Sequence, residues 1–308
     1  MYVRKLGSRT LIHTPAKLNL SLEVLGKRPD GFHEIETIMI AVTVLDTLEF
    51  EPAGGGEIVL TCRWALGLAA RAACQDASLG DLPTGPKNIV WRAAERLRQR
   101  AGVSRGATIH LVKRIPAAAG LGGASSDAAA TLVAANVGWQ LGWSRDQLTT
   151  IAAELGSDIP FFLGCGAAIC RGRGERIERI VTPRLHVVVV RPPTGLSTPQ
   201  VYAACRPADS PQSSGPLAAA LASGQVAAAS RMLNNRLQEP AASISPWIAR
   251  LRAEFERLNV LGHQMSGSGS SYFGICRHAR HARRVATRLQ SRQVGMVFAA
   301  ATALAPAN

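Results

Sequence analysis

The sequence predicts an α+β fold divided into two domains, and three observations support this prediction. The chain has 308 residues, whereas one domain usually holds roughly 100–200. Hydrophobic residues make up 47% of the chain and charged residues 18%, a balance typical of a globular protein with a large core. Segments rich in Ile, Val and Thr, which favour strands, are mixed with segments of helical periodicity. The change of domain is expected near residues 180–210.

The first part of the chain predicts strands followed by a helix. Residues 11–24 and 34–50 are the candidate strands, and Pro, Asp and Gly mark a turn between them at 28–31. Asn88 is suited to cap a helix, because its side chain can accept a hydrogen bond from a backbone N–H of the first turn. Residues 89–97 then follow helical spacing.

The middle of the chain predicts a strand joined to a helix by a loop of small residues. Residues 108–115 form the strand, and Ser125 or Ser126 can cap the helix that follows. Ser144 and Gln147 form a capping-box pattern, which predicts the start of another helix.

The second half of the chain alternates strands and helices around a loop. Residues 186–190 form an apolar run that predicts a buried strand, and 207–216 have the composition of a loop. Ser245 and Pro246 predict a helix start, because Pro fits the first helical position. Residues 272–275 follow a second loop of small residues and form another expected strand.

The charge of the chain favours anionic partners but not nucleic acid. With 35 Lys and Arg against 21 Asp and Glu, the formal net charge is +14. The basic residues are scattered and form no run of the kind that marks a nucleic-acid-binding tail. Aromatic residues are only 5%, so a stacking platform for single strands is poorly supplied. We therefore expect no nucleic-acid partner.

Cysteine usage and hydropathy favour a cytoplasmic protein. No CxxC pair or zinc-ligand spacing occurs, so we expect reduced cysteines and no metal held by them. No apolar run follows the basic N-terminus and no stretch of 18 apolar residues occurs, so neither a secretory signal nor a membrane span is expected. The six cysteines are Cys62, Cys74, Cys165, Cys170, Cys205 and Cys276.

The most informative segment is the loop of Ala and Gly between the strand at 108–115 and the next helix. Small residues let a backbone approach a ligand closely, and a helix start presents unpaired N–H groups with a positive dipole end. Together they favour a phosphate site. The loop is not a Walker loop, which needs Lys, nor a complete GxGxxG fingerprint. The structural alternative is a plain turn before an Ala-rich helix.

Four segments together resemble the GHMP kinase superfamily, whose members transfer the γ-phosphoryl group of ATP to a small-molecule alcohol. The loop Pro-Ala-Ala-Ala-Gly-Leu-Gly-Gly-Ala-Ser-Ser resembles the phosphate loop of that family. The other three segments resemble motifs of its branch acting on a cytidine-diphosphate-linked methylerythritol, and all four occur in that family's order. These three are Pro15-Ala-Lys17-Leu-Asn19-Leu, Arg28-Pro-Asp30-Gly-Phe32-His33 and Gly156-Ser-Asp158-Ile-Pro-Phe-Phe.

The resemblance implies both a fold and a reaction. The fold is the two-domain GHMP kinase fold, with an N-terminal half like ribosomal protein S5 domain 2 and a ferredoxin-like C-terminal half. We expect an ATP-binding domain over 1–181 and a substrate-side domain over 182–308. The implied reaction phosphorylates the 2-hydroxyl of 4-diphosphocytidyl-2-C-methyl-D-erythritol, a step in non-mevalonate isoprenoid biosynthesis.

The resemblance assigns the catalytic roles to Lys17 and Asp158. Asp158 would accept the proton of the substrate hydroxyl, and Lys17 would lie beside it and offset charge in the transition state. Asn19 lies two residues after Lys17 on a strand, so both side chains face one side. Without the resemblance, Asp158 would be interpreted as a turn carboxylate and Lys17 as a solvated lysine.

The substrate assignments also come from the resemblance. His33 would hydrogen-bond the cytosine base, Phe32 would stack on it, and Tyr202 would form the opposite stacking face. The alternatives are core packing for Phe32 and a turn histidine for His33. The full set expected at the substrate is Asn19, Phe32, His33, Asp158, Thr198, Tyr202, Gly267 and Ser268.

The ATP assignments centre on the small-residue loop. Asn88 and Lys113 would lie near the adenine and ribose, and Ser125 and Ser126 would donate to phosphate oxygens. ATP chemistry implies Mg²⁺, carried mainly by the nucleotide, and no Mg²⁺ ligand emerges from the sequence. The full set expected at ATP is Asn88, Lys113, Pro116, Ala117, Ala118, Ala119, Gly120, Leu121, Gly122, Gly123, Ala124, Ser125 and Ser126.

Some residues depart from the family's usual pattern. Ala118 and Ala119 replace glycines, which keeps the loop small but removes freedom for positive φ. Asp127 stands where Asn is common and adds a negative charge near the phosphates. The run 235–238 differs from the usual sequence, which puts its role in doubt. A third Gly-rich loop at 266–270 matches the superfamily and is expected near nucleotide and substrate.

Other functions remain as alternatives. A GHMP kinase for homoserine, mevalonate or a sugar is the first, although the turn with Phe32 and His33 favours a cytidine-containing substrate. A basic nucleic-acid-binding protein is the second, and a catalytically inactive relative is the third. The presence of Lys17 and Asp158 argues against the last of these.

Overall fold

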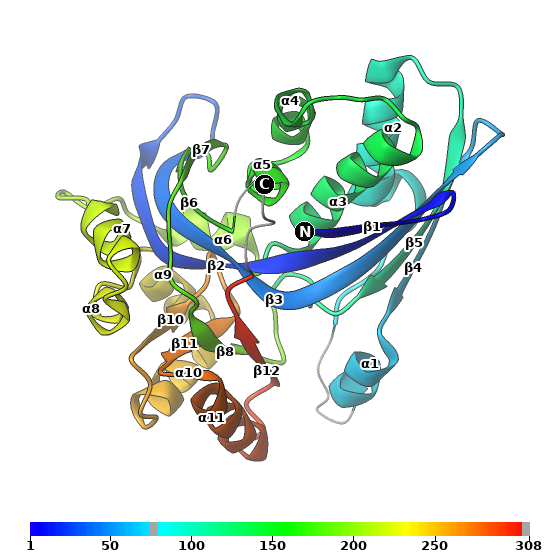
Figure 1. Ribbon diagram of the computed structural model, residues 1–308. Helices are drawn as coiled ribbons and strands as arrows, with labels where there is room; N and C mark the ends of the chain where they lie inside the picture. Colours follow the sequence, from blue (N-terminus) through cyan, green and yellow to red (C-terminus); the bar gives the residue numbers. More distant parts are fainter. Residues whose placement is uncertain (74–78, 165, 304–308) are drawn as a thin grey trace.

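The computed structural model describes residues 1–73, 79–164 and 166–303, and it has two sheets with helices packed on them (Figure 1). The larger sheet has eight strands, with β1-β2-β3-β5-β4 as its main order, and the smaller has four, in the order β10-β11-β8-β12. The predicted α+β class is therefore confirmed.

The larger sheet is built on two long antiparallel strands, β2 and β3. Helices α2, α3, α4 and α5 cover one of its faces (Figure 1). Its strands are β1 (Tyr2–Leu6), β2 (Arg9–Lys27), β3 (His33–Ala53), β4 (Ile58–Trp64), β5 (Gly106–Lys113), β6 (Ala167–Gly172), β7 (Arg176–Arg179) and β9 (Asn234–Asn235). The helices before β6 are α1 (Leu66–Ala73), the 3₁₀ turn η1 (Gly85–Lys87), α2 (Ile89–Ala101), α3 (Gly123–Gly138), α4 (Arg145–Leu155) and α5 (Ile159–Gly164).

The smaller sheet is antiparallel, and its strands are β8 (His186–Arg191), β10 (Gly262–Met265), β11 (Tyr272–Cys276) and β12 (Met296–Ala301). Helix α10 follows the predicted apolar stripe, because Ile248, Leu251 and Phe255 are all buried. The helices of this part are α6 (Thr198–Ala204), α7 (Gly215–Ala222), α8 (Val226–Arg231), α9 (Gln238–Ile244), α10 (Pro246–Glu256) and α11 (Ala279–Ser291).

A shared core joins the two sheets. Leu18 and Ile38 of the larger sheet belong to one buried cluster with Val189 and Phe273 of the smaller sheet. Strand β9 also pairs in parallel with β2, although it comes from the second half of the chain. Strand β2 therefore contacts elements from both halves of the chain.

Several local predictions are confirmed. Asn88 caps α2 by accepting a hydrogen bond from the Val90 N–H at 2.9 Å. Ser144 and Gln147 form the capping box of α4, and Ser245 is the N-cap of α10 with Pro246 at its first position.

One prediction about the helix start is wrong. Helix α3 begins at Gly123 with Gly122 as its N-cap, so Ser125 and Ser126 lie in its first turn rather than capping it. Gly122 has a φ of +67°, a conformation that a serine rarely adopts, and this places the helix start at the glycine.

Two predictions from composition concern cysteines and membranes. Cys62, Cys205 and Cys276 are free thiols and Cys170 is buried, whereas Cys74 and Cys165 lie outside the described residues. Within the described ranges, no helix combines the length and apolar character that a membrane span requires.

Candidate active site

A cavity of about 890 Å³ lies where β2, the small-residue loop, α6 and the third Gly-rich loop meet. It is lined by all of the predicted site residues except Ser126. Residues distant in sequence, such as Lys17, Asp158 and Tyr202, therefore share one space.

The predicted catalytic pair lies together in this cavity. Lys17 Nζ is 3.6 Å from an Asp158 carboxylate oxygen, and it donates a hydrogen bond to Asn19 Oδ1 at 2.7 Å. Asn19 in turn donates to the Thr37 hydroxyl at 2.8 Å. The Lys17 side chain is almost fully buried, while that of Asp158 is 33% exposed. Asn19 thus fixes the ammonium, and the carboxylate stays open to the cavity.

The small-residue loop passes too close to its neighbours for larger side chains. Gly120 and Gly122 have φ values of +70° and +67°. A Cβ at Gly122 would lie 2.9 Å from Lys17 Cγ, and the backbone N–H of Lys17 donates to Leu121 O at 2.9 Å. Ala118 also adopts a positive φ of 48°, so alanine takes up the strained conformation that the sequence suggested it would avoid.

The assignment of Ser126 to a phosphate is wrong. Its side chain is fully buried, and its hydroxyl donates to Pro15 O at 2.6 Å while contacting the Thr14 hydroxyl. The hydroxyl is therefore used to tie α3 to β2. Ser125 does line the cavity.

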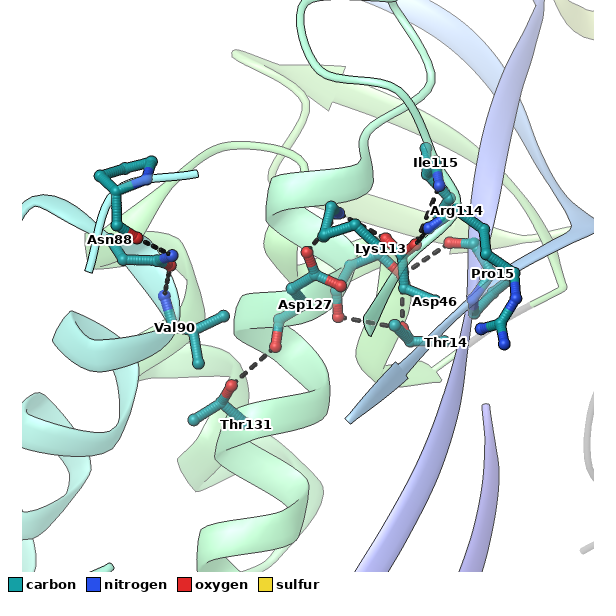
Figure 2. A network of polar contacts seen from close by, with 12 residues as sticks. Thr14, Pro15, Asp46, Asn88, Val90, Lys113, Arg114, Ile115, Asp127 and Thr131 are labelled. Carbon is teal, nitrogen blue, oxygen red and sulfur yellow. Dashed lines mark hydrogen bonds and ion pairs between the residues drawn. The ribbon is translucent and has the colours of Figure 1, made fainter. Parts of the chain in front are cut away.

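Lys113 and Asn88 line the cavity, but their polar atoms bind within the protein. Lys113 forms ion pairs with Asp46 and Asp127, and Asn88 caps α2 and donates to Pro83 O at 2.7 Å (Figure 2). A direct hydrogen bond from either side chain to ATP would have to displace these contacts. Their placement near the adenine and ribose stays a prediction.

The rings predicted for the cytosine base lie at one end of the cavity. His33, not Phe32, packs on Tyr202, with ring centroids 5.0 Å apart and tilted by 31°. Phe32 is half exposed at the cavity edge, and the Arg173 guanidinium lies 4.8 Å from its ring centre. All three rings line the cavity, and the stacking of Phe32 and Tyr202 on opposite faces of the base stays a prediction.

Electrostatics keep His33 neutral at pH 7. Burial lowers the pKa of His33 below its usual 6.5, and the charge of Lys27 adds to this effect. Burial raises the pKa of the Tyr202 phenol, so this group is also uncharged. The pocket formed by these two rings thus presents neutral hydrogen-bonding groups.

The third Gly-rich loop completes the site wall. Gly267 has a φ of +58°, and a Cβ there would lie 3.1 Å from Lys17 Nζ. The hydroxyls of Ser268 and Thr198 are 2.7 Å apart. Ser266 Oγ donates to Gly120 O at 3.1 Å, which joins this loop to the first.

Two contributions escaped the sequence analysis. Arg173 is one of many scattered arginines, and nothing in its sequence context distinguishes it. Asn235 holds the third loop, because its amide nitrogen donates to the carbonyls of Met265 and Gly267, each at 2.8 Å. Its own oxygen accepts from Leu237 N–H at 3.0 Å. The segment whose role was in doubt therefore supports the site.

The described residues offer no cluster of three or more His, Cys, Asp or Glu that could hold a metal ion.

A fold of this kind, with a small-residue loop beside a buried Lys and an Asp, defines a class of small-molecule kinase. The model of the GHMP kinases N terminal domain matches residues 88–166, and that of the GHMP kinases C terminal domain matches 217–294. A homoserine kinase structure from Cytophaga hutchinsonii shares the fold with a TM-score of 0.74 at 18% identity, covering 99% of this chain and 98% of that one.

Relatives of higher sequence identity indicate which family within this class the chain belongs to. The 4-diphosphocytidyl-2-C-methyl-D-erythritol kinase of Pelotomaculum thermopropionicum is 44% identical over 89% of this chain and 91% of its own length. That of a Synechococcus species is 40% identical over 91% and 92%. A crystal structure of 4-(cytidine 5'-diphospho)-2C-methyl-D-erythritol kinase aligns with a TM-score of 0.76 at 33% identity, covering 94% of this chain and 98% of that one. The chain belongs to the family of 4-diphosphocytidyl-2-C-methyl-D-erythritol kinases.

Proposed function

We propose that the chain transfers the γ-phosphoryl group of ATP to the 2-hydroxyl of 4-diphosphocytidyl-2-C-methyl-D-erythritol, giving ADP and the 2-phosphate. One observation carries the proposal. A single cavity joins the phosphate loop, the Lys17–Asp158 pair and the His33–Tyr202 rings. A kinase for a cytidine-linked alcohol needs these three parts in one space, so that the alcohol held at the rings can reach the ATP held at the loop.

In this mechanism Asp158 accepts the proton of the attacking hydroxyl. Its carboxylate is partly exposed to the cavity, so a substrate hydroxyl can reach it. Lys17, 3.6 Å away, places a positive charge beside the carboxylate and the incoming phosphoryl group. Such positioning and charge stabilisation account for most of the rate in phosphoryl transfer.

ATP lies along the small-residue loop. Gly122 caps α3 without a side-chain hydrogen bond, so the first N–H groups of the helix stay available to phosphate oxygens. We place Pro116 to Ser125, together with Asn88 and Lys113, at the nucleotide. Mg²⁺ would come with the nucleotide and neutralise phosphate charge, because the described residues provide no cluster to hold it.

The cytidine diphosphate end lies in the pocket of His33 and Tyr202. The neutral His33 imidazole can donate and accept hydrogen bonds with the base, and the aromatic rings provide stacking surface. Arg173 beside Phe32 supplies positive charge at the same end. The roles of Asn19, Thr198, Gly267 and Ser268 are to shape the wall near the methylerythritol.

The proposal also covers the division of the chain into two parts and its cellular location. The chain divides into an ATP-binding part over 1–181 and a substrate-side part over 182–308, although β9 of the second part joins the larger sheet. A cytoplasmic location fits an enzyme that depends on ATP.

A panel of alcohols tests the proposal. ADP release is measured with 4-diphosphocytidyl-2-C-methyl-D-erythritol, homoserine, mevalonate and galactose, each with ATP and Mg²⁺. Turnover with the cytidine compound alone is expected. Preferred turnover of another alcohol would leave the kinase class intact and refute the proposed substrate.

A further inference from the structure

Three titratable side chains meet beside the phosphate loop (Figure 2). All three are almost fully buried, and Lys113 and Asp127 also line the cavity. Lys113 comes from β5, Asp46 from β3 and Asp127 from the first turns of α3. The Lys113 ammonium is 2.5 Å from an Asp127 oxygen and also contacts Asp46. The exposed fractions of the three side chains are 7%, 0% and 3%. Two carboxylates therefore share one buried ammonium.

The two carboxylates are not equally satisfied. Asp46 accepts hydrogen bonds from the Lys113 ammonium and from the backbone N–H groups of Arg114 and Ile115, the latter at 2.9 Å. Asp127 accepts only from Lys113, and its Oδ1 is buried with no hydrogen-bond partner among the described residues. The Asp46 carboxylate therefore accepts enough hydrogen bonds to stabilise its negative charge, whereas the Asp127 carboxyl group does not.

The charge balance points to Asp127 as the group that is neutralised. Burial raises the pKa of Asp127 well above its usual value, and although Lys113 opposes the shift, the neighbouring Asp46 adds to it. Burial alone would lower the pKa of Lys113, but the two carboxylates outweigh this and raise it, so Lys113 stays charged. Among the described residues, Cys62 also lies at this cluster, and burial, the largest cause, raises the pKa of its thiol to about 11, so the thiol is neutral.

The cluster lies close to the site of the phosphates. A Cβ at Gly123, the first residue of α3, would lie 3.2 Å from Lys113 Nζ. With both carboxylates ionised, the cluster would carry a net negative charge directly behind a loop that must attract anions. Such a charge on side chains that are almost fully buried is poorly screened and opposes phosphate binding.

We propose that Asp127 carries a proton in the folded protein, so that the cluster is neutral as a whole. This replaces the expectation from the sequence that Asp127 adds a negative charge near the phosphates. Asp127 then acts as a positioning residue: it holds α3 to β5 through Lys113 without weakening the positive end of the helix. The bearing on ATP rests on the proposed function, whereas the proton itself can be tested without any ligand.

Infrared spectroscopy of the unliganded protein tests the proton directly. At neutral pH, the spectrum of the wild type minus that of Asp127→Asn should contain the C=O stretch of a protonated carboxylic acid. The matched control is Asp146→Asn, an exposed carboxylate at the start of α4, whose difference spectrum should contain only ionised carboxylate bands. A carboxylate band in the Asp127→Asn difference would overturn the proposal. So would failure of Asp127→Asn to fold, because an amide reproduces the shape and charge of a neutral acid.

The pH dependence of stability gives a second readout that a merely structural role would not change. A folded-state pKa above the unfolded value of about 3.8 means that the folded chain holds a proton which the unfolded chain releases. The stabilisation is therefore complete below that value and is lost as pH rises towards the folded pKa. The Tm of Asp127→Asn minus that of the wild type should increase from pH 5 to pH 7. A constant difference would contradict the proposal.

Discussion

The Lys17 ammonium and the Asp158 carboxylate lie 3.6 Å apart, although one comes from the middle of β2 and the other from the turn before α5. Asn19 fixes the ammonium from one side, and the small-residue loop passes over it through Gly122. The pair therefore lies at the point where the phosphate loop and the substrate pocket meet.

Removing the carboxylate should abolish most of the activity without unfolding the chain. In Asp158→Asn we expect kcat to fall by about 10²–10⁴-fold, because proton acceptance is lost while the side chain keeps its size. The side chain is one-third exposed, so Tm should change little. Steady-state ADP release and a thermal melt measure both quantities. A kcat within threefold of the wild type would exclude Asp158 as the base.

Alanine variants of two glycines with the same φ distinguish the cost of backbone strain from an effect on the active site. Gly122 and Gly142 both have a φ of +67°, so alanine at either should cost about 1–2 kcal/mol of stability. Only at Gly122 would the new Cβ meet Lys17 and Phe162, whereas no described atom lies within 4 Å of a Cβ at Gly142. We expect kcat/KM to fall about 10²-fold in Gly122→Ala and to stay unchanged in Gly142→Ala. Equal activity losses in the two variants would refute this account of the loop.

Two adjacent asparagines test the support of the third loop. Asn235 donates to Met265 O and Gly267 O, whereas the neighbouring Asn234 donates only to Glu23 among the described partners. Asn235→Ala leaves two carbonyls without their donor, and we expect kcat/KM to fall about tenfold or more. Asn234→Ala is the control and should retain activity. The account fails if the two variants lose activity to the same extent.

The His33 and Tyr202 rings should affect the binding of the cytidine substrate and not the binding of ATP. An aromatic contact such as that of Tyr202 is worth about 0.5–1.5 kcal/mol, so Tyr202→Leu should raise the KM for the cytidine substrate about three- to tenfold. The KM for ATP should not change. Tyr2→Leu, at an exposed tyrosine of β1, serves as the control. A parallel rise in both KM values would place Tyr202 outside a specific cytidine pocket.

The sequence was informative where local chemistry decides the structure. Asn88 and the Ser144–Gln147 box predicted helix starts correctly, because capping depends on a few neighbouring residues. The Lys17 and Asn19 parity on β2 was also visible, since strand side chains alternate. The start of α3 was missed because a glycine with positive φ, not a serine, ends the loop.

Long-range partners could not be predicted in the same way. Ser126 has a hydroxyl that could bind phosphate. Only the packing of α3 on β2 shows that this hydroxyl donates a hydrogen bond to Pro15 O instead. The ion pairs that join Asp127, Lys113 and Asp46 connect two strands and a helix, so no local pattern reports them. The contact between His33 and Tyr202 joins β3 to α6, so it too is absent from any local pattern.

The most direct test of the central claim is ³¹P NMR of the reaction products. The chain is incubated with ATP, Mg²⁺ and 4-diphosphocytidyl-2-C-methyl-D-erythritol, with Asp158→Asn in parallel. We predict equal amounts of ADP and a new phosphomonoester on the 2-hydroxyl in the wild type, and neither in the variant over the same time. Loss of ATP without that phosphomonoester, or its formation elsewhere on the substrate, would contradict the claim.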